Sequence, residues 1–400
     1  MLNFLFLFFL PFSSSASPLP QWGLSDVSVL LPLPQEKPEV DLLLKPSSQG
    51  QKGPFLPPSA LALFQFPFVN DLNNTESYAM LRVVALRLDP CFTDHFRPLS
   101  VTCQKQVRLV WQPVWARGEE DITTLDAAFH SFYVFDEAEF FQLAKELLAL
   151  KQNEPSSYRE ALDVPFQLSL EGLTGKYWNS LRKILEKHLG EKNLVRVTQM
   201  SVRGGNMVWA FSGFERENPT SPWTAMSIAG IPKADFQNFI NRDLSGRRFD
   251  GGVFPAATKL ADYLDVLVSP KWEEEAAGTP EKIPLTYEGL LRMENSLKYN
   301  PGTLDCVSCH TVMAARTYLE EHFSEGVSSA DRKDQFRSPF TLKNLGARPS
   351  GTNRLRNFGY FEKEKALSQR VIHESALAAE TMNALFKKDG TTPPLSPKDE

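Results

Sequence analysis

The chain has 400 residues, of which 42% are hydrophobic, 11% aromatic and 23% charged, so it can bury a sizeable core and is neither collagen-like nor wholly disordered in composition. Its length favours one larger and one smaller domain joined by linkers. A formal net charge of -5, together with the lack of zinc-finger spacing and of a Gly-rich phosphate loop, gives no support for nucleic-acid binding.

The first residues predict a leader for export. Residues 1–11 are almost wholly apolar and run into small residues that end at Ala16, as in a secretory signal peptide. We expect residues 1–16 to be removed by cleavage after Ala16 and the mature chain to be periplasmic or otherwise exported. Because no Lys or Arg precedes the apolar run, a buried N-terminal strand or helix is the alternative. No later stretch reaches the roughly 18 uninterrupted apolar residues of a membrane span, so we expect no transmembrane segment in the mature chain.

The next part of the chain predicts a linker followed by strands and helices. Residues 17–60 are dense in Pro and Ser, which favours an extended linker. Apolar and alternating patterns predict strands at 78–88, 106–114 and 130–135. Helical spacing predicts a helix at 137–151, with Asp136 as its N-cap, and another at 174–188.

Two cysteines flank the connection between the first two predicted strands. Cys91 and Cys103 are twelve positions apart and separated by turn-forming residues. In an oxidising compartment this arrangement favours a structural disulfide, and two free thiols are the alternative.

The clearest hairpin pairs 194–202 with 207–214 around a Gly-Gly-Asn turn, and 224–228 adds a short strand. These elements predict an α+β domain over 61–270. An acidic run with a Gly/Pro break predicts a second linker at 271–284. Helices are then expected at 287–296, 311–323 and 366–386, followed by a disordered tail at 387–400.

One motif carries chemistry. Cys306-Val307-Ser308-Cys309-His310 matches C-x-x-C-H, the attachment motif of c-type haem. Two thiols three positions apart lie on neighbouring faces of one helical turn, so each can add across one vinyl group of the same porphyrin, while the adjacent His310 offers its imidazole to the iron. The alternatives are a Cys306–Cys309 disulfide, a redox-active dithiol or half of a metal site. A dithiol does not need His310, and a zinc site needs a second ligand pair at comparable spacing, which the sequence does not show.

The motif and the helix expected after it resemble the start of a cytochrome c domain. The resemblance covers only about residues 287–386 and implies a small, mainly α-helical haem domain over 285–386 with one covalent haem c. In small cytochromes c a loop Met supplies the second axial ligand, and no Met lies between Met313 and Met382. Dihaem peroxidases carry two such motifs, whereas this chain has one, so the resemblance does not imply that activity.

The second iron ligand must therefore come from elsewhere in the C-terminal part. The candidates there are Met313, His322, His373 and Met382. Met313 is three positions from His310 on one helix, so it cannot reach the other side of the ring, and His322 follows further along that helix. Met382 lies on an apolar stripe typical of core. We choose His373, because imidazole is a strong iron ligand, and an iron with no second protein ligand is the rival outcome.

These patterns predict an exported monohaem c-type cytochrome that transfers electrons, with the front domain serving for docking or recognition. The alternatives are a haem-based sensor or binding protein with an open iron site, and an enzyme domain that the haem supplies with electrons, for which no catalytic residues can be named. Residues 331–370 contain ten Lys and Arg against four acids. They can neutralise the haem propionates and present a basic face to an acidic redox partner, or they form a solvated loop.

Overall fold

The structure is a computed structural model that describes residues 22–64, 74–92, 104–151, 161–203, 207–256, 271–340, 342 and 351–388. The predicted signal peptide, the loop with Cys103, the 204–206 turn and nearly all of the predicted tail lie outside these residues. No helix within them is long and apolar enough to cross a membrane.

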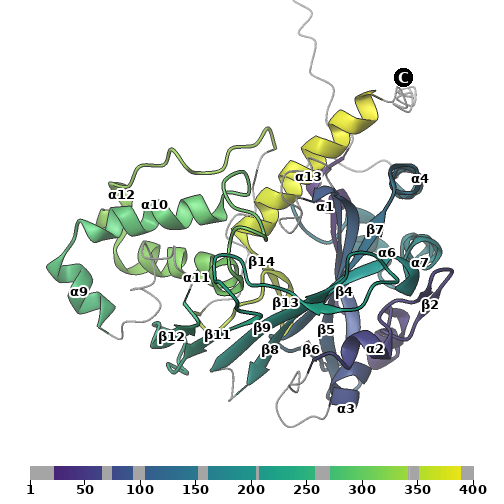
Figure 1. Ribbon diagram of the computed structural model, residues 1–400, viewed down its shortest axis with the longest axis horizontal. Helices are drawn as coiled ribbons and strands as arrows, with labels where there is room; N and C mark the ends of the chain where they lie inside the picture. The colour runs from purple at the N-terminus through teal and green to yellow at the C-terminus, as the bar shows by residue number, and fades with distance from the viewer. Residues whose placement is uncertain are drawn as a thin grey trace, which may run out of the picture.

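Runs of strands and runs of helices follow one another along most of the chain (Figure 1). The helices are α1 (Leu24–Val27), η1 (Lys37–Leu42), α2 (Pro58–Leu61), α3 (Asn74–Ala79), α4 (Glu137–Leu148), α6 (Phe166–Glu171), α7 (Lys176–His188), η2 (Glu191–Asn193), α9 (Trp272–Gly278), α10 (Lys282–Glu294), α11 (Cys306–His322), α12 (Ser324–Ser328) and α13 (Gln369–Lys388). The strands are β1 (Ser28–Leu30), β2 (Gln49–Gly50), β3 (Gly53–Pro54), β4 (Leu81–Phe92), β5 (Gln104–Ala116), β6 (Ile122–Thr124), β7 (Ala128–Phe135), β8 (Leu194–Arg203), β9 (Val208–Glu215), β10 (Thr224–Ala225), β11 (Phe236–Asn241), β12 (Gly251–Phe254), β13 (Phe358–Phe361) and β14 (Glu364–Leu367).

One large antiparallel sheet dominates the fold. Within the described residues it has ten strands in the order β1-β4-β5-β7-β8-β9-β11-β12, with β6 beside β5 and β10 beside β9. The α+β class predicted from the sequence is confirmed. Strands β4, β5, β7, β8 and β9 and helices α4 and α7 overlap the predicted elements, and Asp136 caps α4 by accepting the amide of Glu139 at 2.8 Å.

The two faces of this sheet have different coverings. In β7, Phe129 contacts the ring of Phe64, and Tyr133 donates its hydroxyl to the carbonyl of Phe55, so these odd-numbered residues face the N-terminal segment. Side chains alternate along a strand, so His130 and Phe132 point to the opposite face. On that face lie the C-terminal helices, where Arg87 of β4 pairs with Glu374 of α13. The sheet therefore lies between the segment around Phe55 and Phe64 on one face and the C-terminal helices on the other.

The segment predicted as a Pro/Ser-rich linker is folded where the structure describes it. Strand β1 pairs with β4, and Trp22 and Leu24 are buried. Trp22 also contacts Phe386 of α13, with ring centroids 5.6 Å apart. Proline is compatible with extended chain and with the first turn of a helix, and this segment places its apolar residues in the core between its prolines.

The C-terminal helices complete the core of the sheet. A continuous cluster of buried apolar side chains runs from Trp22 to Phe386, and α13 packs against α1 and β4. Residues 271–284, predicted as a second linker, instead form α9 and the start of α10. The reason is that Ala276 and Ile283 are buried, so this acidic stretch is one face of packed helices.

Candidate haem-binding site

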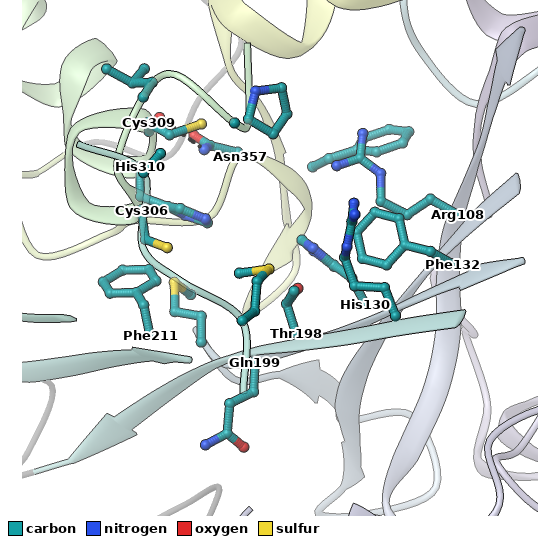
Figure 2. A pocket seen from close by; sticks show the side chains of 18 of the residues that line it. Arg108, His130, Phe132, Thr198, Gln199, Phe211, Cys306, Cys309, His310 and Asn357 are labelled. Carbon is teal, nitrogen blue, oxygen red and sulfur yellow. Dashed lines mark hydrogen bonds between the residues drawn. The ribbon is translucent and has the colours of Figure 1, made fainter. Parts of the chain in front are cut away.

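A cavity of about 330 Å³ separates α11 and α13 from the strands β5, β7, β8 and β9, a size typical of ligand pockets. Figure 2 shows Cys306, Cys309 and His310 on one side and Arg108, His130 and Phe132 on the other. The two cysteines and the histidine of the C-x-x-C-H motif thus face one cavity. Because they fall at positions i, i+3 and i+4 of α11, they share one side of the helix.

Polar contacts with a distant strand fix the first turn of α11. Asp305 is the N-cap and accepts the amide of Ser308 at 3.1 Å. Gln237 of β11 accepts the amide of Val307 at 2.9 Å and donates to the Asp305 carboxylate at 2.8 Å. All four side chains are buried. The motif therefore begins on a helix end that is hydrogen-bonded to the sheet.

The two motif cysteines are free thiols in the structure. Burial raises the pKa of both Cys306 and Cys309, and the nearby Asp305 carboxylate adds to the effect. A redox-active dithiol or a zinc thiolate needs the opposite, a lowered thiol pKa. In the described residues no group of three or more His, Cys, Asp or Glu side chains could hold a metal ion. The raised thiol pKa values do not favour a redox-active dithiol or a zinc thiolate at these cysteines.

His310 has the environment of a neutral metal ligand. Its Nδ1 lies 2.9 Å from the carbonyl oxygen of Leu355, so Nδ1–H donates there and Nε2 keeps a free lone pair. Burial lowers the pKa of His310 to about 4, and the positive charges of Arg356 and Arg108 act in the same direction. The ring also contacts Phe211 of β9 at a centroid distance of 4.9 Å. A backbone carbonyl that fixes the tautomer and orientation of a ligating histidine is a general feature of metal sites.

Arginines surround the cavity, and three of them, Arg108, Arg356 and Arg370, have a buried nitrogen without a hydrogen-bond partner in the described residues. Arg108, Arg196, Arg356 and Arg370 line it against one carboxylate, Glu374. Arg370 is held by Glu374 at 3.0 Å and by two carbonyl oxygens, and Arg196 pairs with Glu215.

Arg356 is less well paired. Its closest carboxylate oxygen, on Asp126, is 3.9 Å away, and its buried Nε and Nη2 have no hydrogen-bond partner among the described residues. The Nε of Arg108 is also buried without a partner there. Buried donors of this kind are costly unless an acceptor reaches them, so they fit an anionic group in the cavity. The two propionates of a haem are such a group.

The structure places His373 away from the cavity. Its Nδ1 lies 2.8 Å from the carbonyl oxygen of Glu294, its Nε2 lies 2.7 Å from the Gln369 amide, and its ring stacks on Phe336. Both ring nitrogens are thus occupied, and the geometry does not favour His373 as an iron ligand. Of the other candidates, Met313 accepts the amide of Gln369, His322 faces the carbonyl of Tyr318, and Met382 is fully buried in the core.

Several residues of the cavity were not singled out from the sequence. His130 begins the strand predicted at 130–135, and it lines the cavity. The alternation in β7 separates its two faces, but only the strand order shows which face meets α11. Cys91 lies near the end of β4, whereas Cys103 lies outside the described residues, so their disulfide stays a prediction.

Comparison with models of known families, with curated proteins and with solved structures finds no match to this chain.

Proposed function

We propose that the cavity holds one haem c, bound through Cys306 and Cys309 with His310 as the proximal ligand, and that this exported protein transfers electrons. The observation that carries the proposal is the convergence of both thiols and the free Nε2 of a neutral His310 on one cavity. Addition of a thiol to a vinyl group transfers S and H to its two carbons, so attachment needs no oxidant and has no leaving group. Bound haem supplies an iron that cycles between Fe(III) and Fe(II).

The chain's own residues would orient the haem and neutralise its charge. The carbonyl of Leu355 holds the His310 ring, and the amide of Asn357 donates to the carbonyl of Cys309 at 3.1 Å. The unpaired donors of Arg356 and Arg108 are available to the propionates. The haem unit resembles a cytochrome c at the motif only, because strands of the sheet supply the other wall of the cavity.

Cations of the basic segment 331–370 lie both beside the cavity and on the surface. Arg356 and Arg370 are buried beside the cavity, while Lys363 and Lys365 pair with Asp121 and Asp163 of the front part. An acidic redox partner remains a proposal, and the exposed Lys333 is one cation that could meet it. A haem-based sensor is the alternative function and differs in leaving one side of the iron open to a small ligand.

Expression with cytochrome maturation factors tests the attachment. Denatured wild type should stain for haem on a gel, and a Cys306→Ser/Cys309→Ser double variant should not. The matched control is Cys91→Ser, which should keep the stain. A colourless wild-type band would overturn the proposal, and so would a double variant that still stains.

A redox titration of the holoprotein tests electron transfer. We expect one reversible one-electron step when a soluble mediator keeps the protein in redox equilibrium with the electrode. If the iron binds carbon monoxide and does not cycle reversibly between Fe(III) and Fe(II), the sensor function would be favoured.

A further inference from the structure

We propose that His130 of β7 is the second protein ligand of the haem iron, on the side opposite His310. This inference rests on the proposed haem attachment and names a residue that the sequence analysis did not single out. It would make the iron six-coordinate through two imidazoles from segments 180 positions apart in the chain.

The strand register places the two imidazoles on opposite sides of the cavity. His130 on β7 is paired with Thr198 on β8, and Thr198 is paired with Gly213 on β9. The ring of His310 rests against Phe211, also on β9. Strand β7, which carries His130, and strand β9, which contacts His310, are thus two strand spacings apart, or roughly 10 Å. Figure 2 shows His130 and His310 on opposite sides of the space between them.

His130 also has a free ring. Of the five described histidines, the other four all have a partner: His310 with Leu355, His373 with Glu294, His322 with Tyr318 and His188 with Glu146. In the part of the chain that the structure describes, neither ring nitrogen of His130 has a hydrogen-bond partner. Its ring contacts Phe132 edge-on, at a centroid distance of 6.3 Å.

The charges around His130 favour its neutral form. Burial lowers its pKa well below the usual range, and positive charges on Arg108 and Arg356 lower it further. Helix α13 brings one carboxylate, Glu374, to this side of the cavity, and Glu374 is already paired with Arg87 and Arg370. A neutral imidazole with a free lone pair is the form that binds iron.

Two methionines line the same cavity and are the competing ligands. Met200 is paired in register with Phe211, the residue against His310. The Cε of Met226 lies 3.0 Å from the place a Cβ on Gly213 would occupy, so it also lies over β9. Met226 therefore lies over β9, the strand that contacts His310, and Met200 lies on β8 between β9 and β7, whereas His130 comes from β7, the more distant strand.

A second ligand from β7 bears on function. An iron held by two protein imidazoles has no open position, which suits electron transfer and disfavours a small-ligand sensor. It would also join the sheet to α11 through the metal.

Spectra of the holoprotein test the inference. Ferric wild type should be low-spin by absorption and electron paramagnetic resonance, with a near-infrared magnetic circular dichroism band typical of two imidazoles. His130→Ala should become high-spin and regain a low-spin spectrum when imidazole is added. His373→Ala is the matched control, a buried histidine outside the cavity, and should keep the wild-type spectrum.

The wild-type spectra need no variant, so the test stands if His130→Ala does not fold. A high-spin wild type, a charge-transfer band typical of a methionine sulfur, or a low-spin His130→Ala without added imidazole would each overturn the role of His130. Conversion to high spin by His373→Ala alone would move the role to His373. The haem stain of the denatured protein reports attachment separately, so a stained band with any of these spectra refutes the ligand and leaves the attachment intact.

Discussion

Replacing Gln237 by Leu should loosen the end of α11 that carries the haem motif. Gln237 is fully buried on β11, and its amide bridges the Val307 amide and the Asp305 carboxylate at 2.9 and 2.8 Å. Leu has a similar volume, so the substitution leaves little empty space, but these two hydrogen bonds and a longer one to the carbonyl of Pro255 at 3.3 Å disappear. An unsatisfied buried amide costs about 1–2 kcal/mol, and a lost bond to a carboxylate about 1.5–3 kcal/mol. The sum is a loss of roughly 2.5–5 kcal/mol in the free energy of unfolding. Asp305 keeps its bonds to Ser308, so no larger loss is expected.

Urea unfolding followed by circular dichroism measures this loss, and hydrogen exchange at the Val307 amide reports it locally. The control is Gln142→Leu on the exposed surface of α4, where Gln142 donates to Glu146 and the change should stay within about 0.5 kcal/mol. If Gln237→Leu loses no more stability than this control and exchange at Val307 is unchanged, the bridge between β11 and α11 does not hold the motif helix.

Three further substitutions and one analysis of the N-terminus extend these tests. Asp305→Ala removes the N-cap of α11 and should lower the free energy of unfolding by about 0.5–2 kcal/mol in urea titrations; an unchanged midpoint would contradict the cap. Burial raises the pKa of Asp126 to about 6 from 3.8. The stabilising contribution of protonated Asp126 is therefore fully present below about pH 4 and is lost as the pH rises through about 6. Asp126→Asn does not titrate, so its stability relative to wild type should rise by up to about 3 kcal/mol between these limits, and a pH-independent difference would refute the raised pKa. Cys103→Ser should cost about 3 kcal/mol without reductant if Cys91 and Cys103 are bridged, and recovery of both as free thiols by peptide mapping of exported protein would disprove the bridge. N-terminal sequencing of exported protein should begin at Ser17, and a chain that starts at Met1 would exclude the predicted leader.

The parts of the site that the sequence could predict are those encoded by neighbours in the chain. The spacing of Cys306, Cys309 and His310 is set by one helical turn, so the side that they share follows from the motif alone. Asp136 before α4 and the β8–β9 hairpin follow from similarly local signals. Each depends on residues within a few positions of one another.

The opposite wall of the cavity depends on strand order, which local patterns do not contain. His130 alternates with Phe129 in β7, which predicts two faces but not which of them meets α11. Gln237 reaches α11 only because β11 follows β9 in the sheet. His373 was a reasonable candidate by residue type, but packing against Phe336 and the carbonyl of Glu294 occupies its ring.

The domain boundaries were also beyond local patterns. Proline and serine between 17 and 60 predicted a linker, but Trp22, Leu24 and Phe55 are buried and tie this segment to the sheet and to α13. Composition measures how a segment would behave alone, whereas burial depends on the partner that covers it.

The mass and spectrum of the purified, denatured protein test the central claim most directly. After expression with cytochrome maturation factors, intact-mass measurement should show the mature chain plus one haem, and peptide mapping should place it on the peptide with Cys306 and Cys309. The reduced pyridine complex should have the absorption band of a haem with both vinyl groups saturated. A chain mass without haem, with free thiols at Cys306 and Cys309, would contradict the account.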